Sequence, residues 1–366
     1  MKELWWNQIG AVIRLEMKKT FFAKRGLWIY LLALAPVALF LAHSLVEIHF
    51  HGVRREMARQ TSRKLTEQDY AALHEGMTRD EVIARFGNPP VSYDRTRRVR
   101  RGPHAFDNIS VETLRYSDGA SELVVHLENG VVTDHSINSG VTFGQDSYVF
   151  AGVFQFFFLR LAVFFGCLGI FMNLFRGEMV DKSLHFYLLA PIRREILLAG
   201  KYLAGLVAAT VIFTSSTALQ LIAMSVQWDA NTISRYLYQD HGLAQIGAYL
   251  GVTVLACVGY GSIFLAAGLL FRNPIVPAAV ILIWEAANPI LPSVLKKLSV
   301  IYYLKSLCPV DIPLDPGMPA LFALLVSNPE PISAYLAVLG LVGLSVLVLW
   351  SSSRRVRRLE INYTTE

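Results

Sequence analysis

Long apolar runs, separated by short polar stretches, dominate the pattern of this chain. A helix needs about 20 apolar residues to cross a bilayer, so these runs predict about six transmembrane helices. The predicted spans are Leu27–Val46, Tyr148–Phe175, Leu203–Val226, Leu243–Phe271, Ile275–Leu291 and Ile332–Trp350. Prolines crowd the fifth run, and proline interrupts helices because it lacks a backbone N–H. The predicted fold class is a polytopic α-helical membrane protein with a small inserted α+β domain.

Composition agrees with this prediction, since 54% of the residues are hydrophobic and only 17% are charged. Residues 1–26 are basic and amphipathic, which is typical of a helix lying in the membrane interface. An ordinary cytoplasmic lead-in to the first span would explain them equally well. A cleavable signal peptide is not predicted, because no small-residue cleavage site follows the long first span.

Lysine and arginine in the short loops predict the orientation, because cytoplasmic loops carry an excess of both. They gather before the first span, between the second and third, and after the sixth, which predicts that both termini are cytoplasmic. The net charge of +6 then reflects topology, and no nucleic-acid partner is expected. The three cysteines, Cys167, Cys257 and Cys308, imply neither a disulfide framework nor a metal cluster.

Residues 51–146 differ from the rest of the chain, because the apolar runs stop and turn residues appear. Thr78 and Glu81 match a capping box that opens a helix ending at Gly87. Alternating apolar and polar positions then predict three strands with tight turns between them. These strands are Val111–Tyr116, Glu122–Leu127 and Val131–Ile137. We expect a small α+β domain on the outer side of the membrane.

An arginine-rich run is the densest charge cluster of this domain. Its members are Arg95, Arg97, Arg98, Arg100 and Arg101. They could contact phosphates of anionic lipids, but a solvated flexible loop is the commoner explanation of such runs, and we favour it.

Residues 65–137 also resemble the BamE-like (SmpA/OmlA-type) domain. The resemblance lies in Gly76-Met-Thr78, the helix that follows and Gly87-Asn-Pro89. That family consists mainly of periplasmic lipoproteins. This chain has no lipidated cysteine before the domain, so the resemblance implies a periplasmic location but not an outer-membrane one.

The loop between the second and third spans has a helical pattern of its own. Apolar Val180, Leu184 and Leu188 recur at helical spacing, and Pro191 ends the pattern. With Phe175-Arg-Gly-Glu178 and Gly200-Lys201, this loop is similar to that of type-2 ABC transporter membrane subunits. In that family the matching segment, 176–194, is a coupling helix that docks on an ATP-binding partner. The residues assigned to coupling are Glu178, Asp181, Lys182, Leu184, Leu188, Pro191, Arg193 and Arg194.

The resemblance implies a dimeric exporter permease, paired with itself or with a second membrane subunit, in the bacterial inner membrane. The chain has no phosphate-binding Gly-x-x-x-x-Gly-Lys-Ser/Thr loop and no nucleophilic triad, so we predict a non-enzymatic subunit whose separate partner binds ATP and Mg²⁺. A lipidic or amphipathic cargo is favoured. The alternative is a non-transporting anchor or sensor that presents the BamE-like domain to the periplasm. For Glu178 the alternative to coupling is a carboxylate favoured at a helix N-terminus.

Polar residues inside the spans are costly and usually face the interior of the bundle. Arg160 and Glu285 are predicted to approach one another, within one protomer or across a dimer, and Asn288 could line a path or pack between helices. Residues 292–331 contain apolar segments too short to span, which predicts re-entrant or interfacial helices or a structured loop. The predicted parts are thus the amphipathic helix 1–26, the first span 27–50, the inserted domain 51–146, the remaining spans 147–353 and the basic tail 354–366.

Overall fold

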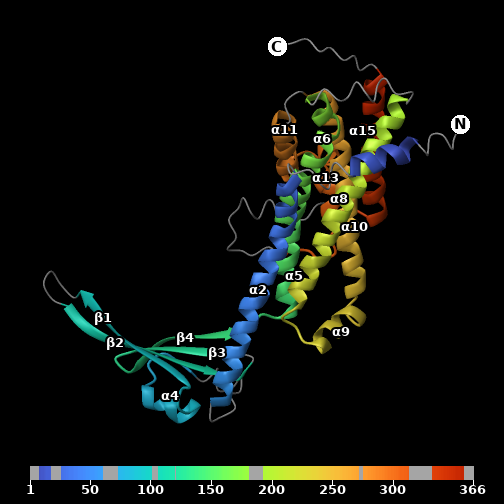
Figure 1. The fold of residues 1–366 in the computed structure, drawn as a ribbon. Helices are drawn as coiled ribbons and strands as arrows, with labels where there is room; N and C mark the ends of the chain where they lie inside the picture. The colour runs from blue at the N-terminus through green and yellow to red at the C-terminus, as the bar shows by residue number, and fades with distance from the viewer. Residues whose placement is uncertain are drawn as a thin grey trace. The chain divides into compact units, whose positions relative to one another are not determined.

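The computed structural model describes residues 8–17, 26–60, 73–100, 106–119, 121–180, 193–271, 275–312 and 332–357 (Figure 1). The chain forms two compact units. The first, here called the membrane unit, comprises Met1–Leu41 and Asp146–Glu366. The second, here called the sheet unit, is Ala42–Gln145.

Helices make up the membrane unit, beginning with a short one over residues 8–17. Helix α2 (Leu27–Gln60) follows and continues into the sheet unit, well beyond the predicted end of the first span. Helix α5 (Phe143–Val153) continues through the π-helix η2 (Phe154–Val163) into α6 (Phe164–Val180). The remaining long helices are α8 (Arg194–Ser225), α10 (Gly242–Leu270) and α15 (Ala334–Arg357). The shorter ones are α9 (Ala230–Tyr238), α11 (Ile275–Ala287), η3 (Asn288–Ile290), α12 (Ser293–Lys296) and α13 (Val300–Leu307).

Five helices in the described part of the chain are long and apolar enough to cross a membrane. They correspond to five of the predicted spans, as expected of a polytopic helical membrane protein. The sixth predicted span, Ile275–Leu291, corresponds to a shorter apolar helix over Ile275–Ile290, directly after residues 272–274, which lie outside the described part of the chain. Helix α11 has 13 residues and passes into the 3-10 helix η3, with Pro289 near its start. At 1.5 Å per residue, Ile275–Ile290 is about 24 Å long, shorter than the apolar core of a bilayer.

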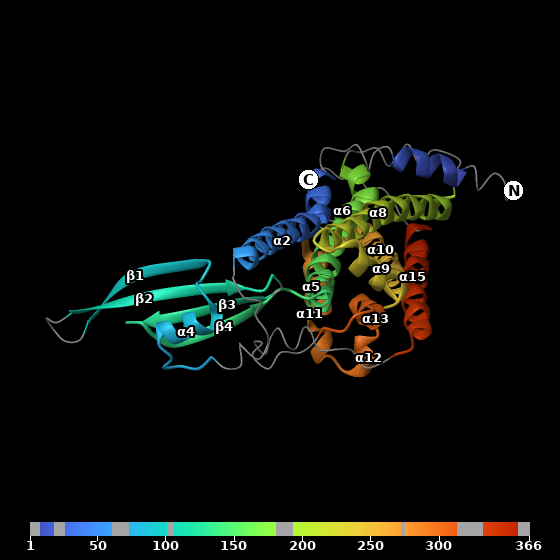
Figure 2. The ribbon, with the colours of Figure 1, turned by 90° about the horizontal axis from the view of Figure 1, so that it is seen from below.

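Helix α10 lies at the centre of the membrane unit and packs against α6, α8 and α15 (Figures 1 and 2). Aromatic side chains fill part of this interior: the ring of Tyr249 lies edge-on to Phe150 and Phe154, at centroid distances of 4.9 and 4.8 Å. The predicted outer segment begins with α12 and α13, and α13 packs against α10 and α15. Residues 313–331 of that segment lie outside the described residues.

Gly268 lies where α10 comes close to the backbone of α6. A Cβ atom there would lie 3.1 Å from the backbone of Met172, which a rigid helix cannot move away from. We expect Gly268→Ala to lower the free energy of unfolding by about 1–3 kcal/mol, because it overpacks this contact. Gly251→Ala on the same helix is the matched control, since nothing lies within 4 Å of its Cβ position. Unfolding temperatures in detergent check this prediction, and an equal effect of both substitutions would contradict it.

The sheet unit contains helix α4 (Arg79–Phe86) and a four-stranded antiparallel sheet in the order β1-β2-β3-β4. Its strands are β1 (Val91–Arg100), β2 (Phe106–Ser117), β3 (Ser121–Glu128) and β4 (Val131–Ser139). The capping box of Thr78 and Glu81 is present as predicted. Asn129 and Gly130 both have positive φ, 51° and 81°, as a tight hairpin turn requires.

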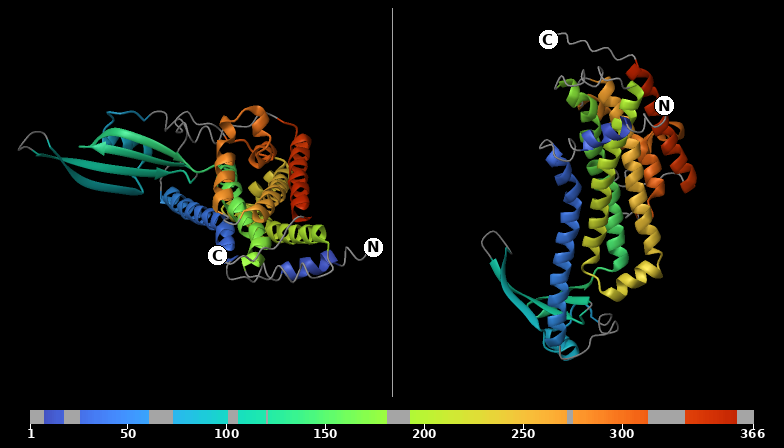
Figure 3. Two further views of the ribbon diagram at one scale, coloured as in Figure 1. Left: turned by 90° about the horizontal axis from the view of Figure 1, so that it is seen from above. Right: turned by 45° about the vertical axis from the view of Figure 1, so that its right-hand side comes forward.

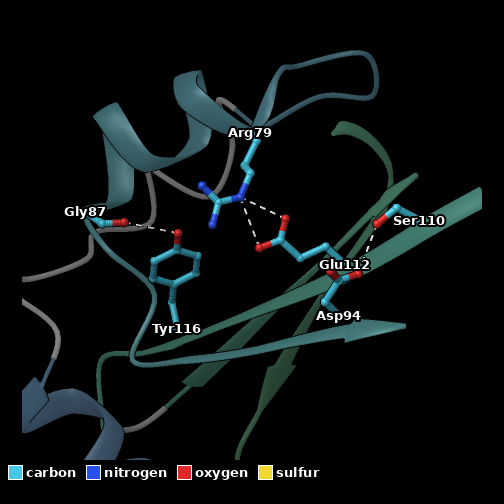
Figure 4. Close-up of polar contacts among 6 residues, drawn as sticks. All are labelled: Arg79, Gly87, Asp94, Ser110, Glu112 and Tyr116. Atoms are coloured by element: carbon cyan, nitrogen blue, oxygen red, sulfur yellow. Dashed lines mark hydrogen bonds and ion pairs between the residues drawn. The ribbon is translucent and has the colours of Figure 1, made fainter. Parts of the chain in front are cut away.

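Apolar side chains from α4 and from one face of the sheet form the core of this unit. They are Leu73, Met77, Val82, Phe86, Leu114, Tyr116, Leu123, Val125, Leu127 and Val132. Burial raises the pKa of Tyr116 to about 12, and its hydroxyl donates to the carbonyl of Gly87 at 3.1 Å (Figure 4). The phenol is therefore neutral and hydrogen-bonded at physiological pH.

The flexible loop favoured for the arginine run is wrong. Arg95, Arg97, Arg98 and Arg100 belong to strand β1, which pairs with β2 from Val91 to Arg100. Arg101 lies outside the described residues. The run lacks the apolar alternation of a half-buried strand, and backbone pairing with β2 decides its structure instead.

Candidate functional site

A buried ion pair lies at the end of the membrane unit where α8 begins. The Lys201 Nζ lies 2.6 Å from the Glu16 Oε1 and donates to the carbonyl of Leu174 at 2.8 Å. The same ammonium stands 5.3 Å from the centre of the Phe175 ring. The side chains of Lys201 and Glu16 are only 0% and 4% exposed. Removing these charges from water is costly, and the salt bridge, the carbonyl and the aromatic ring compensate.

This ion pair joins three segments that are distant in sequence. Glu16 comes from the helix over residues 8–17, Leu174 from α6 and Lys201 from α8. Next to Lys201, a Cβ atom on Gly200 would lie 3.0 Å from Val12, so glycine is what allows the two helices to come this close. Figure 3 shows the short helix lying at the end of the bundle where α8 begins. Since Val12 and Glu16 are both buried, one face of this helix packs on the bundle.

The contact between Lys201 and Leu174 spans the predicted coupling segment: Leu174 precedes the segment in the sequence and Lys201 follows it. Helix α6 ends at Val180 and α8 begins at Arg194, with Arg193 as its N-cap residue. The carbonyl of Arg193 accepts from the N–H groups of Ile196 and Leu197, so it starts the helix. Five predicted coupling residues lie outside the described residues: Asp181, Lys182, Leu184, Leu188 and Pro191.

Glu178 belongs to helix α6. Both interpretations of its carboxylate stay predictions, because the side chain of Glu178 and residues 181–192 lie outside the described part of the chain. The helix predicted over 176–194 does not begin as a separate element, since its first residues continue α6.

Glu16 was not predicted as a site residue, and Lys201 was predicted only as part of the family pattern Gly200-Lys201, without a partner. One signal was available, because Glu16 is an isolated acid on the apolar face of a basic segment, four residues after Val12. A buried position for it requires a cationic partner.

A second polar site is built around Glu285, which is 5% exposed and lies on α11. Its carboxylate accepts from the backbone N–H groups of Val300 and Ile301 at 2.9 and 2.8 Å, and from the Ser299 hydroxyl at 2.8 Å. Ser299 is the N-cap residue of α13, but its side chain does not cap that helix. Glu285 supplies the cap from a different helix, and its negative charge suits the positive end of α13.

Arg160 and Tyr260 lie near this carboxylate. The Tyr260 hydroxyl is 3.5 Å from the Glu285 Oε2, and Arg160 is close enough for the two side chains to interact electrostatically. Arg160 lies within the π-helix η2, a rare form of helix that often occurs at functional sites. Asn288 donates to the carbonyl of Lys296 at 3.2 Å, which joins η3 to α12.

Other polar side chains inside the bundle connect helices. Ser216 on α8 donates to the carbonyl of Ala33 on α2, and Thr217 pairs with Thr253 on α10 at 3.0 Å. At the opposite end of α8, the buried Asp146 on α5 accepts from the side chains of Gln227 and Trp228. These contacts favour the packing interpretation of the intramembrane polar residues.

Among the residues that the structure describes, no group of three His, Cys, Asp or Glu side chains could hold a metal ion. No family model, curated protein or solved structure matches the chain.

Proposed function

We propose that this chain is the membrane subunit of an ABC exporter, whose separate partner hydrolyses ATP. The observation that carries the proposal is the buried ion pair of Lys201 and Glu16. It fastens the end of α6 and the start of α8, the two helices that enter and leave residues 181–192. A segment held at both of its ends can transmit a force from a docked partner into the bundle.

The apolar helices and the distribution of basic loops support a multi-pass protein of a bacterial inner membrane with cytoplasmic termini. The segment 181–192 then faces the cytoplasm, where an ATP-binding partner is available. The sheet unit lies in the periplasm in this orientation. The cargo we favour is lipidic or amphipathic, and the complex contains two membrane subunits.

Copurification tests the proposal. The tagged chain is isolated from membranes of its own host, and ATPase activity and bound proteins are measured. We expect an ATP-binding protein to copurify, and to be lost when Leu184, Leu188 and Arg193 are all replaced by alanine, because these residues belong to the proposed docking segment.

The matched control replaces two apolar residues and one arginine at the opposite end of the bundle, namely Arg235, Tyr238 and Leu243. This variant should retain the partner. If the docking variant keeps the same ATPase as the control, the transport proposal fails and the alternative of a membrane anchor for the sheet unit is favoured.

A further inference from the structure

The paired strands β1 and β2 extend beyond the rest of the sheet. Strand β3 pairs with β2 only from Val111 to Ser117, whereas β1 pairs with β2 along its whole length, out to Arg100 and Phe106 (Figure 1). We call the part from Tyr93 to Arg100 on β1, with its partners on β2, the ribbon. Strand β1 is also an edge strand of the sheet.

On the α4 side of the ribbon, two carboxylates accept hydrogen bonds from other residues of the sheet unit. Glu112 accepts from Arg79 of α4 at 2.8 Å, and Asp94 accepts from the Ser110 hydroxyl at 3.0 Å (Figure 4). The hydrogen bond to Glu112 raises the pKa of the Arg79 guanidinium. Both of these acids lie on the α4 face and both are engaged there, whereas Asp107, which pairs with Val99, occupies a register position of the opposite face.

The opposite face has a different chemistry, since side chains alternate between the faces of a strand. It carries Tyr93, Arg95 and Arg97, paired across the ribbon with Thr113, Val111 and Ile109. Tyr93 is 59% exposed, and both arginines are exposed. Neither arginine has a hydrogen bond or ion pair within the described residues. On the same face, Glu128 lies beyond β2 on β3, about 10 Å from Arg95 across two strand spacings.

We propose that this face of the ribbon binds the anionic surface of a phospholipid bilayer. Arginine forms bidentate hydrogen bonds to phosphate. Tyrosine prefers the level of lipid headgroups, where its ring is buried and its hydroxyl remains hydrated. The aliphatic Val111 and Ile109 between these groups suit the boundary of the acyl chains. A soluble acidic protein could pair with the two arginines, but its binding would not require the aromatic and aliphatic side chains beside them.

This inference concerns the sheet unit alone and does not depend on the transport proposal. It is tested with the full-length protein in nanodiscs of neutral phosphatidylcholine, incubated with sedimenting vesicles with or without phosphatidylglycerol. We expect the protein to sediment with the anionic vesicles only. The double variant Arg95→Gln/Arg97→Gln should bind them roughly 30-fold more weakly. Each basic residue near an anionic surface contributes about fivefold to the affinity, so the loss of two gives this factor.

The control double variant Arg55→Gln/Arg85→Gln removes the same charge from exposed helix positions of the same unit. It should bind as the unchanged protein does. Equal losses in both double variants would overturn the proposal, because attraction would then depend only on net charge. Unfolding temperatures should not change with Arg95→Gln/Arg97→Gln, because these side chains have no internal partners among the described residues.

Tyr93→Ser distinguishes a bilayer from a free phosphate. We expect it to weaken binding to anionic vesicles and to leave binding of soluble polyphosphate unchanged. If the protein binds polyphosphate but no vesicles, or if Tyr93→Ser has no effect on vesicle binding, the ribbon does not recognise a lipid surface.

Discussion

Replacing Lys201 by methionine is expected to destabilise the membrane unit more than any exposed substitution does. The change leaves the Glu16 carboxylate and the Leu174 carbonyl in a buried site without their ammonium donor. Breaking one half of a buried ion pair typically costs about 3–5 kcal/mol. The expected result is a marked fall in the unfolding temperature, measured by size-exclusion chromatography of heated, detergent-solubilised protein. Lys297→Met, at an exposed lysine, is the matched control and should change little.

The double variant Lys201→Met/Glu16→Met gives the sharper test. Replacing both charges by apolar side chains of similar size removes the desolvation cost together with the attraction. The double variant should therefore be more stable than Lys201→Met alone. If the two single effects simply add, the two side chains are not energetically coupled, and the ion pair does not fasten these helices.

Glu285→Ala is expected to release the N-terminal end of α13. Without the carboxylate, the N–H groups of Val300 and Ile301 have no acceptor in an apolar interior. Each unsatisfied buried donor costs about 1–3 kcal/mol, so we expect a total loss of about 2–6 kcal/mol. Hydrogen exchange measured by mass spectrometry should show faster exchange for residues 300–307.

Ser299→Ala provides the graded control for this prediction. It removes one hydrogen bond to the carboxylate but leaves both backbone donors satisfied, so a loss of about 1 kcal/mol is expected. Unchanged exchange of α13 in Glu285→Ala would show that another group holds the helix start. An equal effect of Ser299→Ala would show that the hydrogen bond from the Ser299 hydroxyl, and not the bonds from the Val300 and Ile301 N–H groups to Glu285, holds the start of α13.

Apolar run length predicted the long helices well, because spanning a bilayer imposes a minimum length on any single sequence. At Ile275–Leu291 the described α-helix is shorter than the predicted span, because it passes into the 3-10 helix η3 with Pro289 near its start. Run length counts apolar residues but does not register a proline that interrupts the helix.

The polar contacts were harder to predict, since they join residues far apart in the chain. Lys201 and Glu16 are 185 residues apart, and only the packing of three segments brings them together. Strand β1 was missed for a related reason, because its structure depends on β2 and not on its own pattern. The capping box of Thr78 was predicted correctly, since both of its residues belong to one turn.

Helix α8 is anchored at both of its ends. Lys201 holds one end to α6 and to residues 8–17, and Gln227 and Trp228, just beyond the other end, hold Asp146 of α5. These anchors are 26 residues apart, which corresponds to about 39 Å along a helix. No proline interrupts Arg194–Ser225, so the helix has no proline kink. A push at its first turn would therefore tilt the helix as a whole and be transmitted to the start of α5 at its other end.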